Sequence, residues 1–188
     1  MRAVVSGHRV RLLGISLLGA AGLCYAALAA APPARAATEC DTITDALRKF
    51  LATNARQFGT QTVDTLPGIA TKVETIHADG VAYLWAHGQW IKNPMTLADL
   101  QKQNEDTLKN HPVCKWLRDE TLDGQPTAVY SELTTTAGIK VDSTLWISKA
   151  SGLPLQQDVT SDTPAKKGKL HAVTRFEYEN VKAPELSE

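Results

Sequence analysis

Short alternating segments joined by two-residue turns are the feature that most limits how this chain can fold. Asp79-Gly80 separates two segments in which apolar and polar residues alternate, and Asp123-Gly124 marks another such turn. The loop at 149–152 lies between two further apolar stretches. Turns of this kind are typical of β-hairpins, whose strands pair antiparallel. No β-α-β alternation is present, so the sequence predicts an antiparallel sheet of about seven or eight strands rather than a doubly wound parallel one.

Two other stretches have the periodicity of amphipathic helices. The first, at 40–58, carries on one face Ile43, Ala46, Leu47, Phe50 and Leu51. Its expected N-cap is Asp41 or Thr42, with Asp45 as the capping-box partner of Thr42. The second helix is expected to begin at Thr96, with Asp99 in the capping-box position. The predicted fold class is therefore α+β, an antiparallel sheet with an N-terminal helix and a mid-chain helix.

The first 36 residues have the composition of a secretory signal peptide. Arg2, Arg9 and Arg11 precede an apolar run at 12–30, and the small residues at 34–36 fit a cleavage site. A positive start, an apolar middle and a small-residue exit are typical of a cleaved leader. The alternative is a membrane anchor, because the apolar run is close to the shortest that can span a bilayer. Prolines before the small residues favour cleavage, so the sequence predicts a signal peptide at 1–36 and a periplasmic protein.

Removal of the leader would leave two of the three cysteines in the chain. Cys24 lies in the leader, which leaves Cys40 and Cys114 in the exported chain. Two cysteines in an oxidising compartment predict one disulfide, with two free thiols or a reactive cysteine as the alternatives. Neither Cys24 nor Cys40 follows a small residue, so neither is expected to carry a lipid.

Charge argues against a nucleic-acid partner. The whole chain has 20 basic and 20 acidic residues, and four of the arginines lie in the leader. The exported part therefore carries 16 basic and 20 acidic residues, a net charge of −4. A mildly acidic surface of mixed charge offers no electrostatic footprint for nucleic acid.

No pattern in the exported part indicates catalysis, a metal or a cofactor. Its histidines show no i, i+4 pair, and its cysteines are too far apart in sequence to suggest a chelating motif. His77 and His87 flank a turn and could form a weak site with Glu74, although ordinary strand histidines explain them better. The G-x-S-x-G and phosphate-loop motifs are absent. Neither an enzyme nor a cofactor is predicted.

Three stretches resemble the periplasmic LolA/LolB-like family. They are the G-x-x-x-x-x-Y from Gly124 to Tyr130, the W-I-x-x-x-x-G-L-P-L from Trp146 to Leu155, and a last strand that ends at 181–184. The resemblance implies a single half-barrel domain at 37–188, in which both helices pack on the concave side of a curved antiparallel sheet. It also implies binding of lipid or lipoprotein acyl chains.

The chain departs from the carrier pattern in two respects. Family members use an arginine to latch the helical lid, and no residue here can be assigned that role, although Arg48 and Arg56 are available. A disulfide between Cys40 and Cys114 would also stiffen the first helix over the sheet and hinder opening for a bulky lipoprotein.

Several strands carry large apolar residues on both faces, which indicates either an ordinary core or the wall of a cavity. In the cavity interpretation, the groove and its lid are formed by Phe50, Leu51, Tyr83, Trp85, Tyr130, Leu145, Trp146, Phe176 and Tyr178. Burial of an acyl chain is worth about 0.8 kcal/mol per methylene, so such a groove needs no charged residue. The predicted function is binding of lipid or lipoprotein acyl chains by a monomer. The alternative is a non-enzymatic domain that uses the sheet as a platform for another envelope protein, and an enzyme with an unrecognised site is a weaker third.

Overall fold

The structure is a computed structural model that describes residues 38–109, 111–136, 138–163 and 168–186. The predicted signal peptide at 1–36 lies outside the described residues. The elements, in chain order, are α1 (Glu39–Leu51), β1 (Ala55–Val63), β2 (Ala70–Ala78), β3 (Val81–Ala86), β4 (Gln89–Lys92), α2 (Leu97–Leu108), β5 (Val113–Leu122), β6 (Gln125–Thr136), β7 (Ile139–Ser148), β8 (Pro154–Asp162) and β9 (Lys169–Glu177). The helices in this part of the chain are too short or too polar to cross a membrane.

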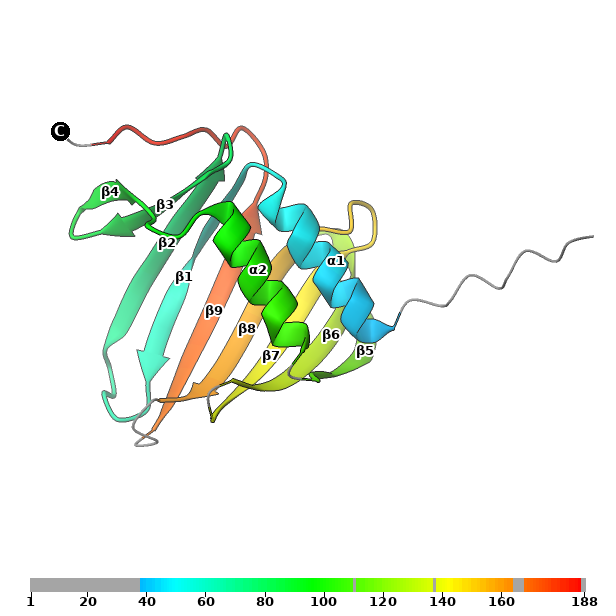
Figure 1. Ribbon diagram of the computed structural model, residues 1–188. Helices are drawn as coiled ribbons and strands as arrows, with labels where there is room; N and C mark the ends of the chain where they lie inside the picture. The colour runs from blue at the N-terminus through cyan, green and yellow to red at the C-terminus, as the bar shows by residue number, and fades with distance from the viewer. Residues whose placement is uncertain (1–37, 110, 137, 164–167, 187–188) are drawn as a thin grey trace, which may run out of the picture. The chain divides into compact units, whose positions relative to one another are not determined.

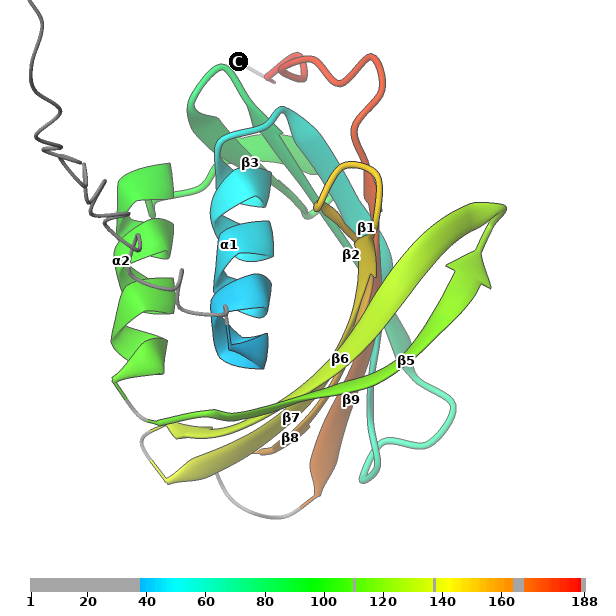
Figure 2. The same ribbon diagram turned by 90° about the vertical axis from the view of Figure 1, so that its right-hand side faces the viewer.

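The strands form one nine-stranded sheet in the order β4-β3-β2-β1-β9-β8-β7-β6-β5. Every pair of neighbours is antiparallel. The sheet is curved and open, and both helices lie on its concave side (Figures 1 and 2). The predicted α+β half-barrel class is thereby confirmed.

The first and last strands pair at the centre of the sheet and join its two halves. Gly59 of β1 lies opposite Thr174 of β9. A Cβ atom at Gly59 would overlap the carbonyl oxygen of Val173, so only glycine permits this close approach of the two backbones.

Strand β1 corrects the sequence-based boundary of the first helix. The helix was expected to reach residue 58, but α1 ends at Leu51 and a strand begins at Ala55. The physical reason is local. Thr53 and Asn54 interrupt the apolar periodicity, and the Thr53 hydroxyl bonds back to the carbonyl of Lys49 instead of the chain continuing as helix.

The helix caps confirm one prediction and correct another. In α2, the Thr96 hydroxyl accepts from the amide of Asp99 at 3.1 Å, and the Asp99 carboxylate accepts from the Thr96 amide at 3.0 Å, as predicted. The cap of α1 is instead Thr38, paired in the same way with Asp41. The predicted cap was wrong because Asp41 fits equally well as the third residue of an earlier helix start.

The two helices are held differently. The apolar face of α1 buries Ile43, Ala46 and Phe50, and the helix contacts β5, β6 and β8. Helix α2 packs against α1. None of the α2 side chains that the structure describes is fully buried. Helix α1 therefore belongs to the core, whereas α2 covers it.

Candidate ligand-binding site

The two faces of the sheet can be told apart from the packing of β7. Leu145 and Ile147 form a buried cluster with Ile43 and Ala46 of α1, so they point to the helices. Trp146, between them, points to the opposite, outer face because successive strand residues alternate. Residues that pair across strands share a face, and the register therefore extends this assignment over the sheet.

Six of the nine predicted groove residues lie on the helix-facing side: Phe50, Leu51, Tyr130, Leu145, Phe176 and Tyr178. The Phe50 and Phe176 rings pack edge to face with centroids 5.2 Å apart. The Tyr178 hydroxyl donates to the carbonyl of Pro154. These six side chains pack chiefly against one another and α1, so they fix that helix to the sheet.

The other three predicted residues lie on the outer face. The Trp146 indole donates to the carboxylate of Glu120 on β5. Tyr83 is buried beside Val181 of the C-terminal segment, which crosses this face. Trp85 is 41% exposed, and its ring contacts that of Trp90. The nine residues therefore do not lie on one surface.

A cavity of about 330 Å³ lies between the two helices and strands β6 to β8. It is lined by Ile43, Thr44 and Leu47 of α1, Gln103, Asn104 and Thr107 of α2, Glu132 and Thr134 of β6, Val141 and Ser143 of β7, and Gln157 of β8. None of the nine predicted residues is among them. Ile43, Leu47 and Val141 make part of the wall apolar, and the other lining residues are polar.

Sequence reasoning missed the polar part of this wall although the signal was available. Glu132 and Thr134 follow Tyr130 at intervals of two on β6, so all three share the helix-facing side. Tyr130 was selected because it is aromatic, and the two polar residues were passed over because a groove for acyl chains was expected to be apolar.

Glu132 and Thr134 of β6 form the floor of the cavity, and their side chains lack partners in the part of the chain that the structure describes. The hydroxyl oxygen of Thr134 is buried and has no hydrogen-bond partner. Glu132 pairs across the strands with Ser143, and its side chain has no hydrogen bond or ion pair with any residue the structure describes. Burial raises the pKa of the Glu132 carboxyl because the charged form is poorly solvated there.

Two other depressions lie on the outer face, and the arginine in each is already paired with a carboxylate. One contains the ion pair between Arg175 and Asp123, at 2.6 Å. The other contains the pair between Arg56 and Glu74, at 2.7 Å. Because these charges are already matched, the helix-side cavity is the stronger candidate for a ligand site.

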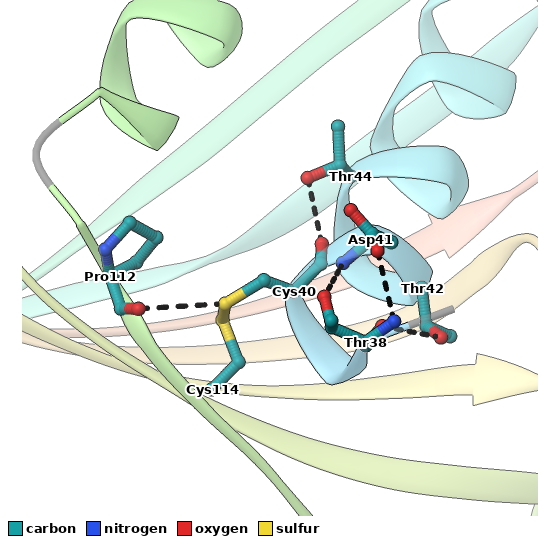
Figure 3. The surroundings of a disulfide bond; sticks show 7 residues. All are labelled: Thr38, Cys40, Asp41, Thr42, Thr44, Pro112 and Cys114. Atoms are coloured by element: carbon teal, nitrogen blue, oxygen red, sulfur yellow. Dashed lines mark hydrogen bonds between the residues drawn. A yellow bond between two sulfur atoms is a disulfide. The ribbon is translucent and has the colours of Figure 1, made fainter. Parts of the chain in front are cut away.

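The predicted disulfide is present between Cys40 and Cys114, whose Cα atoms are 5.2 Å apart (Figure 3). Cys40 lies in the first turn of α1, and Cys114 is the second residue of β5. The bond therefore fastens the start of α1 to the outermost strand of the sheet. Phe50 anchors the other end of the helix, so α1 is held at both ends.

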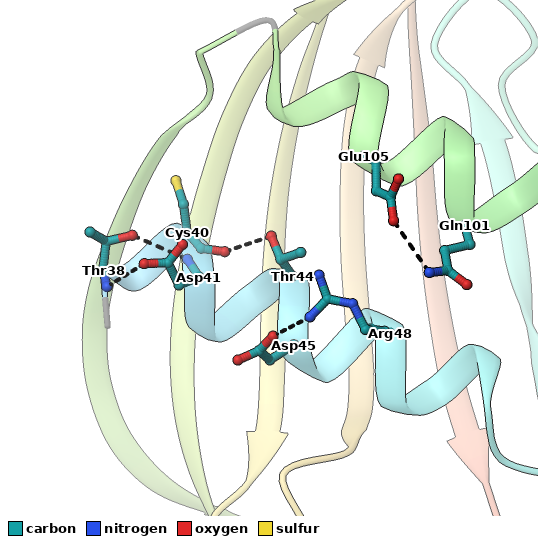
Figure 4. A network of polar contacts seen from close by, with 8 residues as sticks. All are labelled: Thr38, Cys40, Asp41, Thr44, Asp45, Arg48, Gln101 and Glu105. Carbon is teal, nitrogen blue, oxygen red and sulfur yellow. Dashed lines mark hydrogen bonds and ion pairs between the residues drawn. The ribbon is translucent and has the colours of Figure 1, made fainter. Parts of the chain in front are cut away.

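The polar side-chain contacts drawn in Figure 4 lie within each helix. Arg48 pairs with Asp45 of its own helix, and Gln101 of α2 donates to Glu105, also of its own helix. Arg56, the other arginine considered for a latch, pairs with Glu74 on the outer face. Neither arginine joins a helix to the sheet.

No protein-family model matches the chain, and no curated protein sequence matches it. Solved structures do resemble it in fold. Lipoprotein LppX from Mycobacterium tuberculosis has a TM-score of 0.47 and 12% identity, covering 78% of this chain and 98% of that one. MucB, solved in complex with MucA, has a TM-score of 0.45 and 11% identity, covering 80% of this chain and 62% of that one.

A LolA superfamily protein from Nitrosomonas europaea is also similar, with a TM-score of 0.25 and 9% identity over 71% of this chain and 86% of that one. The likeness to LolA-like proteins predicted from the sequence is confirmed to that extent. At these identities it concerns the fold alone.

Metal ligation has no support in the part of the chain that the structure describes, where no three His, Cys, Asp or Glu side chains gather. His77 is instead a core residue. Its ring packs against that of Phe50, with centroids 4.6 Å apart, and its Nδ1 atom is buried without a partner. Its cross-strand neighbours, Ala55 and Ala82, are uncharged.

We expect His77 to make the fold sensitive to acid. Burial lowers the pKa of its imidazole, so the folded state favours the neutral ring. The stability that this preference contributes is present above the unfolded-state pKa of about 6.5 and is lost as the pH falls through the lower folded-state value. We expect His77→Leu to lose less stability than the wild type between pH 7 and pH 5, measured by urea unfolding. His87→Asn, which changes an exposed histidine in the turn between β3 and β4, serves as the control and should lose as much stability as the wild type.

Proposed function

We propose that the protein is exported to the periplasm and carries an acyl-chain lipid in the cavity beneath α1 and α2. In this proposal residues 1–36 are the cleaved signal peptide and 37–188 the functional domain. The observation that supports it best is the cavity of about 330 Å³, which falls within the range of small-molecule sites. Its apolar wall, Ile43, Leu47 and Val141, suits a hydrocarbon chain.

The energetics of such a site favour a chain that is buried rather than held by charges. Each methylene removed from water contributes about 0.8 kcal/mol. A short buried chain therefore supplies several kcal/mol, enough for reversible binding without a latch. This agrees with the finding that neither Arg48 nor Arg56 bridges a helix and the sheet.

The first experiment is native mass spectrometry of the protein purified from the periplasm under non-reducing conditions. We expect the mass of a chain that begins at residue 37, together with an adduct in the mass range of a lipid. A protein that emerges without lipid, and from which periplasmic crosslinking traps another envelope protein, would support the platform alternative instead.

A cavity-filling substitution gives the quantitative test. We expect Val141→Trp to weaken binding of a pyrene-labelled monoacylglycerol about tenfold, since displacing about two methylenes costs roughly 1.6 kcal/mol. The matched control is Val173→Trp, at a position on the outer face that is 44% exposed. The control should bind within about twofold of the wild type. Equal affinities for the two variants would exclude the cavity as the binding site.

A further inference from the structure

We propose that the cavity selects amphiphiles with an uncharged head group that carries hydroxyl donors, such as a glycerol, over amphiphiles with an anionic head group. Glu132 and Thr134 on the cavity floor make this selection. The inference rests on the proposed function and adds the class of ligand.

The geometry places an acceptor and a hydroxyl next to each other on one wall. Glu132 and Thr134 are separated by one residue on β6 and face the helices. Across the strand pair, Glu132 lies opposite Ser143 and Thr134 opposite Val141, and all four line the cavity. Polar groups on this wall thus lie beside the apolar side chain of Val141.

Neither Glu132 nor Thr134 has a hydrogen-bond partner among the described residues, and a ligand could supply one to each. Thr134 is only 9% exposed, and its hydroxyl oxygen is one of two buried side-chain polar atoms without a partner among the described residues. A buried polar group left unpaired costs about 1–3 kcal/mol. Ligand hydroxyls that donate to the Glu132 carboxylate and to Thr134 would recover that cost.

The charges around the cavity disfavour an anion. Of the described residues that line it, none is Lys, Arg or His. Arg48, which lines the smaller space between the helices, is already paired with Asp45. A carboxylate or phosphate head group would therefore meet Glu132 without a compensating cation, and like charges in a partly buried site repel.

Two pyrene-labelled probes with the same acyl chain, a monoacylglycerol and a fatty acid, test the selection at pH 7.5. We expect the wild type to bind the monoacylglycerol at least tenfold more tightly, as measured by fluorescence titration below the micelle concentration. Glu132→Gln should bring the two affinities within about threefold, chiefly by improving fatty-acid binding. Thr134→Val should weaken monoacylglycerol binding about threefold or more.

The control is Glu177→Gln, which removes an exposed carboxylate on the outer face and should leave the preference unchanged. Circular dichroism verifies that each variant is folded. If Glu132→Gln does not fold, Thr134→Val still tests the inference. Equal binding of the two probes by the wild type, or a preference that survives Glu132→Gln, overturns the inference while the proposed function stands. If neither probe binds, both fail.

Discussion

Replacing both Cys40 and Cys114 with serine is expected to lower the free energy of unfolding by about 4 kcal/mol. The two cysteines are 74 residues apart in sequence, and in the chain-entropy model a crosslink over a loop of that length restricts the unfolded chain by about this amount. The measurement is urea unfolding under non-reducing conditions, followed by circular dichroism. Because a typical domain has a total stability of 5–15 kcal/mol, the variant should retain its fold but with a small margin.

Reduction provides the matched control for this result. The wild type treated with a thiol reductant should approach the stability of the double variant, and the double variant should not respond to the reductant. A loss below about 1 kcal/mol would contradict the expectation that the disulfide stabilises the fold by restricting the unfolded chain.

Phe50→Ala is expected to cost about 3–5 kcal/mol of unfolding free energy. The side chain is buried between β2 and β9, where it contacts the rings of His77 and Phe176. Removing a buried phenyl ring loses its transfer free energy and leaves a cavity that rigid neighbours fill only in part. Urea unfolding measures the loss, and a large effect would show that α1 is held by its C-terminal end as well as by the disulfide.

Val173→Ala is the control for the phenylalanine variant. Val173 lies on β9, as Phe176 does, but its side chain points to the outer face of the sheet and is exposed. Its truncation should change the stability by no more than about 1 kcal/mol. If the two variants lose similar amounts, the packing beneath α1 is not a principal source of stability.

The hairpin signals predicted most of the sheet because they depend on short-range chemistry. Asp79 and Asp123 adopt positive φ values of 53° and 50°, as the two-residue turns require. Strand β1 was missed for an equally physical reason. Its helix-facing positions include Gln57, Gly59 and Gln61, so it lacks the apolar alternation that announces a strand, and pairing with β2 and β9 supplies what local propensity does not.

The candidate site was less predictable than the fold. Aromatic residues at alternating positions indicate burial, but the sequence does not say which face of the sheet a strand turns towards the helices. Tyr83 and Trp146 therefore came into the same set as Phe176, although they lie on the opposite face. Alternation along β6 places Glu132 and Thr134 on the helix-facing side, whereas their neighbours on β7 follow from strand register. Glu132 lies opposite Ser143, eleven positions on, and Thr134 lies opposite Val141, seven positions on.

The irregularity in the pairing of β5 has a consequence for self-association. An open sheet ends in a strand whose outward backbone groups can template another chain, and β5 is such an edge, with Trp116 and Leu117 exposed on it. Its register with β6 shifts between Trp116 and Arg118, and the charged residues Arg118, Asp119 and Glu120 follow at once. A bulge combined with charge is a common means by which natural sheets discourage edge-to-edge aggregation, so this border of the half-barrel is protected against adding a tenth strand.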